Sequence, residues 1–225
     1  MSLSLSLPPD EICWFLWSKF EQIWQSHPLR TYIPHDWPTQ QTMQNLVMWT
    51  SGQFIYMMTV MKYVDLAQHR PIEHLEAVLR IVNPLGNIPF AELDCLYHHI
   101  LTSAHNTKGV LHILGALLCS QKLYSRKDTL GKLKLPIPIT GPWFLKELLL
   151  LNRGDVPFIL TDLHAILNIP NARCNTISQP SNAKLSKQGL RILHHSLSDF
   201  LIADDNITIG NNVDQNNPNA VTMEQ

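Results

Sequence analysis

Apolar residues recur at intervals of three to four through most of residues 10–105, and prolines divide this pattern into segments. An α-helix has about 3.6 residues per turn, so this spacing places the apolar side chains of each segment on one face. The residue before a proline avoids the helical conformation, which makes proline a common helix boundary. Such boundaries fall near Pro28, Pro38, Pro71 and Pro84. We therefore expect about five helices with short connections, which form an all-helical bundle.

Local signals indicate where some of these helices begin and end. Asp10 and Thr39 precede helical patterns, where a short polar side chain can accept a hydrogen bond from a free backbone N–H group. Pro71 suits the first turn of a further helix. Ser51 and Gly52 interrupt the pattern, and residues 83–86 (NPLG) form a turn signal.

The pattern of apolar residues changes over residues 106–205. Residues 110–119 are apolar on nearly every side, which predicts a central helix. Further helices are expected over residues 143–151, ended by Gly154, and over residues 156–167, whereas the proline-rich residues 133–139 must run extended. A polar stretch over residues 170–189 precedes a strand candidate at residues 190–193 and a short helix through residues 197–201. This order is typical of a small winged-helix unit.

The sequence thus predicts a mainly α protein, a helical bundle followed by a small winged-helix-like unit with a short β-hairpin. We expect one domain over residues 1–105 and a second over residues 106–205. Residues 206–225 contain six asparagines and few apolar residues, which predicts a disordered tail.

Charge separates the two halves. Residues 1–105 carry five basic and nine acidic residues, whereas residues 106–205 carry twelve and seven. A nucleic-acid-binding winged-helix protein is therefore the alternative function, but the basic charges are spread out rather than gathered in a stripe, which favours a protein partner. The residues in question are Lys122, Arg126, Lys127, Lys132 and Lys134.

The cysteines and the apolar segments indicate a compartment. Four cysteines are widely spaced and mostly lie in apolar stretches, which favours buried, reduced thiols. Residues 1–7 make a poor signal peptide, and no apolar run reaches the roughly 18 residues of a membrane helix. We expect a cytoplasmic protein without a membrane partner.

Motifs for catalysis or metal binding are missing. Gly131-Lys132 lacks the upstream glycine and the hydroxyl of a phosphate-binding loop. Residues 157–162 mimic a magnesium-binding strand that ends in Asp162, but their period is helical. His69 and His74 approach an inverted zinc-protease motif with the wrong spacing. We therefore predict no enzyme activity, no catalytic residue and no metal ligand, and a hydrolase remains only a remote alternative.

Five groups of segments carry a family resemblance, in one order over residues 10–205. They are residues 10–12 with 19–23 and 27–29, residues 33–38 (IPHDWP), residues 51–56 (SGQFIY) with 59–60, residues 89–94 (PFAELD) with 96–97 and 100–101, and residues 193–201 (LHHSLSDFL). This series resembles fungal members of the NACHT family of signal-transducing NTPases (STAND, or NOD-like receptor, type), in the region C-terminal to the nucleotide-binding core.

The resemblance implies a lid-like helical domain and a winged helix that close on ADP or ATP held by a separate core. Nucleotide exchange or hydrolysis would then shift the winged helix and expose an oligomerising surface. By position, His194 would face the phosphates, and Gly52, Phe54 and Ile55 would border the adenine. No cofactor is expected for this chain alone, because the core that holds the phosphates is missing from it.

Simpler interpretations stay open. His194 also fits a buried histidine satisfied by backbone groups, and Phe54 lies in a core stripe with or without a nucleotide. Three features depart from the family pattern: residues 170–189 are long for a wing, residues 132–139 look inserted, and His195 stands where a small residue is usual. The chain begins where the core would end, as expected for a truncated product, a fragmentary gene model or a standalone derivative. Its expected partner is a NACHT core or a full-length relative.

Overall fold

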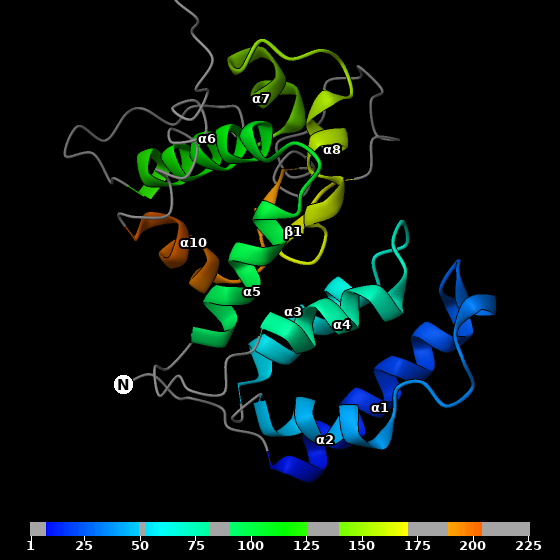
Figure 1. Cartoon of the computed structure of the whole chain (residues 1–225). Helices are drawn as coiled ribbons and strands as arrows, with labels where there is room; N and C mark the ends of the chain where they lie inside the picture. Colours follow the sequence, from blue (N-terminus) through cyan, green and yellow to red (C-terminus); the bar gives the residue numbers. More distant parts are fainter. Residues whose placement is uncertain (1–7, 50–52, 82–90, 126–139, 171–188, 204–225) are drawn as a thin grey trace, which may run out of the picture.

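The computed structural model of the chain describes residues 8–49, 53–81, 91–125, 140–170 and 189–203, with the side chains of all but residues 120–125. Within these ranges the chain is mainly helical, and two short antiparallel strands pair near its C-terminal end (Figure 1). The predicted fold class is therefore confirmed.

Helix α1, Pro9–Ser26, buries the face that its apolar spacing predicts. Its inward residues are Ile12, Leu16, Phe20 and Ile23. The predicted Asp10 cap is wrong, because Pro8 is the N-cap residue, Pro9 begins the helix and no side chain caps it. Asp10 lies in the first turn instead, where its negative charge favours the positive end of the helix dipole.

Two helices pack against α1. A short 3₁₀ helix, η1 (Arg30–Tyr32), leads to α2, Gln40–Trp49, and α3 spans Phe54–Val64. Thr39 caps α2 as predicted, since its Oγ1 accepts a hydrogen bond from the backbone N–H of Thr42 at 3.2 Å. Met57, Met61 and Val64, which follow Phe54 at helical spacing, are buried.

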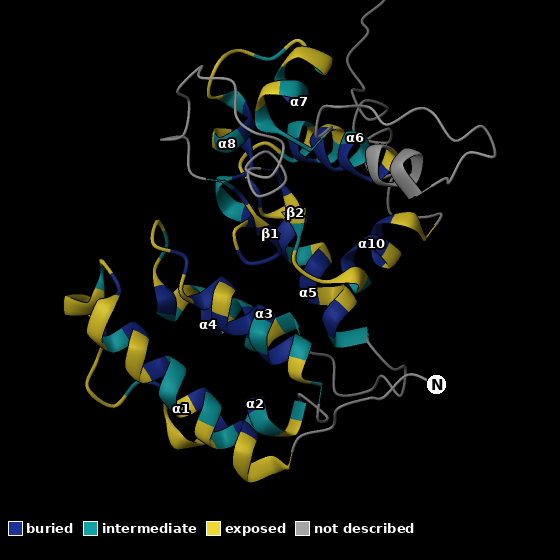
Figure 2. Cartoon of the chain, turned by 180° about the vertical axis from the view of Figure 1, so that it is seen from behind, coloured by how far each residue is buried: buried dark blue, intermediate teal, exposed yellow. Residues whose placement is uncertain are grey.

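Helix α5, Ala91–Thr102, connects the helices near the N-terminus with the rest of the chain. It contacts α3 and α4 (Pro71–Ile81), and also α6 (Thr107–Ser125), α10 (His195–Ile202) and the 3₁₀ helix η2 (Thr161–Leu163). Figure 1 shows α5 between the lower and upper groups of helices, and Figure 2 shows its buried faces. Its buried residues include Leu93, Leu96, Tyr97 and Ile100, which recur at the helical spacing expected of an apolar face.

Helix α6, Thr107–Ser125, is the predicted central helix. The side chain of Asn106 caps it by accepting the backbone N–H of Gly109 at 2.8 Å. Val110, Ile113 and Leu117 are fully buried. Cys119 and Cys95 are exposed, however, so the prediction of buried thiols is wrong for these two residues. Periodicity marks which faces of a helix are apolar, and both thiols stand off those faces.

Two short helices follow. Helix α7 spans Pro142–Leu148 and α8 spans Asp155–Ile159. The prediction that Gly154 ends the first of these helices is wrong. Gly154 instead precedes α8 as its N-cap residue, with a φ of 94°. This left-handed conformation suits glycine, which has no Cβ to clash with the backbone.

The helix predicted over residues 156–167 is broken. After α8 the chain forms η2, Thr161–Leu163, and then strand β1, Leu167–Asn168. Strand β1 pairs with β2, Arg191–Ile192, so that Leu167 faces Ile192. Helix α10, His195–Ile202, completes the described chain. The strand and final helix predicted over residues 190–201 are thus confirmed.

Several predicted features lie outside the described residues. They are Gly52, the turn at residues 83–86, the extended residues 133–139, most of the polar stretch over residues 170–189 and the tail over residues 206–225. The buried apolar residues from Ile12 to Leu201 form one continuous cluster. The division into domains at residue 105 stays a prediction.

Candidate functional site

His194 caps the N-terminus of α10. Its backbone is extended, and its Nδ1 accepts the backbone N–H of Ser196 at 3.2 Å and lies 2.7 Å from Ser196 Oγ. The side chain is exposed rather than buried. The alternative of a buried histidine is therefore wrong, although a backbone group does satisfy one ring nitrogen.

This cap leaves the far side of the His194 ring available. A nitrogen that accepts a hydrogen bond cannot carry the proton, so the neutral ring carries it on Nε2. Partial burial and the neighbouring His195 lower the pKa of His194, whereas Asp199 raises it. The pKa is lowered as a result. At neutral pH the ring thus presents an Nε2–H donor, and among the contacts of the described residues none uses this atom.

Tyr97 links this cap to the protein interior. Its hydroxyl lies 2.9 Å from Ser196 Oγ and can donate to it, while the Ser196 hydroxyl donates in turn to Nδ1 of His194. Burial raises the pKa of Tyr97, Asp94 adds to this, and hydrogen bonding by Ser196 and Thr59 opposes it. The phenol is therefore neutral, and its hydroxyl joins α5 to α10.

The predicted adenine-side residues begin α3. Phe54 is 40 % exposed and meets Phe15 of α1 edge to face, with ring centroids 5.4 Å apart. Ile55 is partly buried against the core, and its carbonyl accepts the hydroxyl of Thr59 at 2.9 Å. This hydroxyl bond spans one turn of α3. Gly52, the fourth predicted site residue, lies outside the described ranges.

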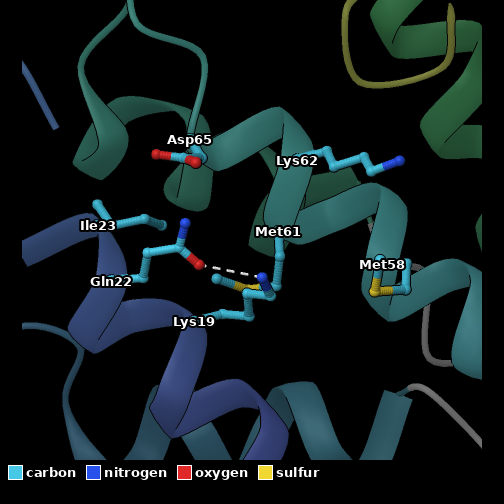
Figure 3. A pocket seen from close by; sticks show the side chains of 7 residues that line it. All are labelled: Lys19, Gln22, Ile23, Met58, Met61, Lys62 and Asp65. Atoms are coloured by element: carbon cyan, nitrogen blue, oxygen red, sulfur yellow. Dashed lines mark hydrogen bonds between the residues drawn. The ribbon is translucent and has the colours of Figure 1, made fainter. Parts of the chain in front are cut away.

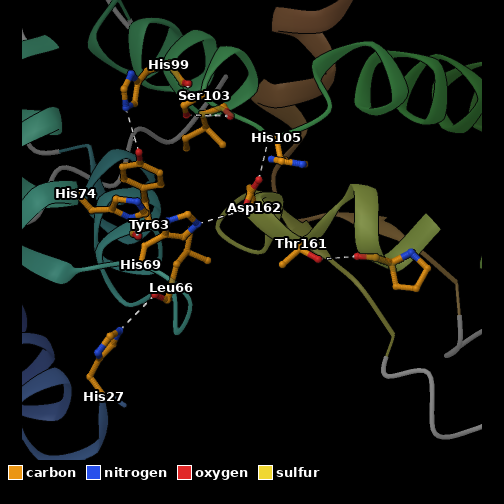
Figure 4. A network of polar contacts seen from close by, with 12 residues as sticks. His27, Tyr63, Leu66, His69, His74, His99, Ser103, His105, Thr161 and Asp162 are labelled. Carbon is orange, nitrogen blue, oxygen red and sulfur yellow. Dashed lines mark hydrogen bonds and ion pairs between the residues drawn. The ribbon is translucent and has the colours of Figure 1, made fainter. Parts of the chain in front are cut away.

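A second polar assembly had no counterpart in the predicted site (Figure 4). It surrounds the ring of Tyr63 on α3, whose hydroxyl lies 3.0 Å from Nε2 of His99 on α5. The ring of His74 on α4 stacks on Tyr63, and the ring of His69 stacks on His74. We name Tyr63, His69, His74, His99 and Asp162 the Tyr63 cluster.

Asp162 fixes η2 to two other segments. Its Oδ1 accepts Nε2–H of His69 at 3.1 Å, and its Oδ2 accepts the backbone N–H of His105 at 3.0 Å. Burial raises the pKa of this carboxyl. The two hydrogen bonds and the nearby histidines lower it by more, so the pKa lies below its usual value. The acid that resembled a magnesium ligand in the sequence thus serves as a structural anchor.

The histidines do not assemble a metal site within the part of the chain that the structure describes, where no three metal-binding side chains converge. His27 shows the structural role that several of them have. Its Nδ1 accepts the backbone N–H of Leu29 at 3.0 Å, so Nε2–H donates to the carbonyl of Leu66 at 3.2 Å. The ring is buried and fully used in joining α1 to the end of α3.

A shallow hollow lies between α1 and α3, and none of the predicted site residues lines it (Figure 3). Its volume is about 70 Å³, far below the roughly 300–1,000 Å³ of a typical ligand pocket. The lining side chains are Lys19, Gln22, Ile23, Met58, Met61, Lys62 and Asp65. Two of these side chains bond each other, since Lys19 donates to Gln22 Oε1 at 3.0 Å.

The basic residues considered for nucleic acid binding lie outside the described side chains. None of the helices, within the residues described, is long and apolar enough to cross a membrane. Comparisons with models of known protein families, with curated proteins and with solved structures each found no match.

Proposed function

We propose that the chain is a non-catalytic regulatory module of the NACHT type, which binds a separate nucleotide-binding core in the cytoplasm and takes part in nucleotide-dependent signalling or oligomerisation. The proposal rests on the ordered resemblance over residues 10–205. The observation that carries it furthest is the geometry of His194. Capping by Nδ1 directs the Nε2–H donor away from α10 and leaves it without a partner among the described residues.

A donor in this position suits an anionic oxygen such as that of a phosphate. A hydrogen bond to a charged group contributes about 1.5–3 kcal/mol, enough to bias an equilibrium between two states tenfold or more. Contact with ADP at His194 would be felt through Ser196 and Tyr97, whose hydroxyls join α10 to α5. These hydrogen bonds connect a residue that would contact the nucleotide with a buried tyrosine of α5.

The test is a binding titration of the full chain with a fungal NACHT core that contains an intact phosphate-binding loop, with ADP, with ATP and without nucleotide. His194→Asn is the informative variant, since asparagine is a favoured N-cap residue but its short side chain cannot replace Nε2. We expect this variant to lose about tenfold or more of the affinity gained with nucleotide.

His195→Asn is the matched control, because His195 is a neighbouring exposed histidine whose ring bonds Asp199 on its own helix and does not cap α10. It should bind as the unaltered chain does. Absence of association with the core, with or without nucleotide, contradicts the proposal. Equal binding by the His194→Asn and unaltered chains contradicts the role of His194.

A further inference from the structure

His74 fastens the first half of α4 to α3 through two contacts. Its Nδ1–H donates to the backbone carbonyl of Tyr63 at 2.7 Å. Its ring also lies parallel to the Tyr63 ring, with centroids 4.1 Å apart and an interplanar angle of 1°. The contact is well formed when the imidazole is neutral, because the hydrogen bond uses only one ring nitrogen.

A positive charge on His74 would meet other ionisable groups at close range. The ring of His69 stacks on that of His74 with centroids 4.5 Å apart, and His99 of α5 bonds the hydroxyl of the same tyrosine. Three imidazoles thus share one small region (Figure 4).

Two acidic groups face this region. Asp162 of η2 is already bonded by His69 and by the backbone of His105. Glu73, beside His74 on α4, is exposed and paired with Arg70. Neither carboxylate makes a direct bond with His74. A second or third proton on the imidazoles is therefore poorly compensated.

The electrostatic surroundings agree with this geometry. Burial lowers the pKa of His74, and its bond to the Tyr63 carbonyl opposes this effect. His69 and His99 lower the pKa further, whereas Glu73 raises it. The pKa of His74 is lowered as a result. Burial and then His98 lower the pKa of His99. Acid consequently favours any state in which these rings reach water.

We propose that the Tyr63 cluster is an acid-sensitive latch, in which protonation of His74 beside His69 releases the first half of α4 from α3. The bonds of Asp162 to His69 and to the backbone of His105 do not involve the His74 ring. The opening is therefore local, confined to α4 and the turn before it. It does not depend on the nucleotide-linked role proposed above.

Amide hydrogen exchange of the full chain, followed by mass spectrometry at about pH 7.5 and about pH 5.5 and corrected for the intrinsic rate, tests the latch. Exchange in residues 66–81 should increase about threefold or more in acid beyond any increase in residues 107–119 of α6, which report the fall in global stability. Far-UV circular dichroism should show that the helices persist at both pH values. Equal acceleration in both regions, or in neither, overturns the proposal.

Two substitutions separate the latch from general acid sensitivity. His74→Phe retains an aromatic ring against Tyr63 but cannot take up a proton, so the acid response of residues 66–81 should disappear. His112→Phe alters an exposed histidine of α6 and should leave that response intact. Persistence of the response in His74→Phe contradicts the assignment.

If His74→Phe does not fold, an NMR titration of the unaltered chain gives the decision. The His74 ring should take up its proton below the ordinary histidine pKa of about 6.5, together with chemical-shift changes in the backbone amides of α4. A His74 ring that titrates at or above the ordinary histidine pKa of about 6.5, or titrates without changes in α4, overturns the proposal.

Discussion

The hydroxyl of Tyr97 lies 2.9 Å from Oγ of Ser196 and ties α5 to the first turn of α10. The residue is only 1 % exposed, so its hydroxyl has little access to water. The contact joins segments that are 99 residues apart in the chain. The position of the exposed His194 ring therefore depends on a buried tyrosine of a different helix.

Tyr97→Phe removes this hydroxyl and leaves the ring in place. We expect a loss of about 0.5–1.5 kcal/mol in the free energy of unfolding, the usual contribution of one hydrogen bond, measured by urea denaturation. Tyr32→Phe is the control, since Tyr32 is 77 % exposed and should give no change. An equal effect of both substitutions would show that the Tyr97–Ser196 bond contributes nothing.

Asp162→Asn tests the anchor between η2, the segment before α4 and the segment before α6. The variant loses a charge-assisted hydrogen bond. We expect its free energy of unfolding at neutral pH to be lower by about 1.5–3 kcal/mol. Asp199→Asn, which removes an exposed i,i+4 pair with His195, should cost no more than about 1 kcal/mol.

The Asp162 effect has a defined pH dependence. Because the folded protein lowers the pKa of this carboxyl, its contribution is present above the ordinary aspartate pKa of about 4 and is lost as the pH falls below it. The difference between the unaltered chain and Asp162→Asn should therefore narrow in urea unfolding curves between about pH 5 and pH 3. A difference that widens over this range contradicts the assignment.

Apolar spacing predicted burial better than it predicted secondary structure. Val156, Ile159, Leu160, Leu163, Ile166 and Leu167 follow a helical period, and all six are buried. They do not form one helix, however. Thr161 Oγ1 donates to the carbonyl of Pro157, Asp162 is held by His69, and the backbone of Leu193 donates to the carbonyl of Ile166. These contacts come partly from residues 27 and 93 positions away, which a local pattern does not record.

The candidate site divides in the same way. His194 could be chosen from a local motif, and its capping role follows from its position before a helix. The Tyr63 cluster had no local signal, because its members stand on α3, α4, α5, η2 and a connecting turn. In the sequence, His69, His74 and Asp162 were considered only as parts of metal-binding motifs, which their spacing did not fit. Only the packing of α5 against α3, α4 and η2 shows that they bond to one another and to Tyr63.

Mild acid should lower the stability of the whole protein. Burial is the first cause of a lowered pKa for His74, His99, His164 and His194. The unfolded chain then binds more protons than the folded one as the pH falls below the ordinary histidine pKa of about 6.5. Stability is full above that pH and declines as the pH passes through the folded values. Urea unfolding at about pH 7.5, 6.5 and 5.5 measures this decline, and a free energy that rises in acid contradicts it.

Leu150 has a φ of 54° and is 92 % exposed, so it combines a left-handed backbone with almost no burial. A Cβ in this conformation costs roughly 1 kcal/mol, which glycine avoids. Leu150→Gly should therefore raise the free energy of unfolding by about 0.5–1 kcal/mol, although the greater freedom of glycine in the unfolded chain offsets part of the gain. Leu148→Gly is the matched control, because Leu148 is the last residue of α7 and half-exposed, and there glycine should destabilise by about 1 kcal/mol. Thermal or urea unfolding of both variants should thus give changes of opposite sign, and destabilisation by both would mean that the Leu150 side chain makes a contact that outweighs its backbone strain.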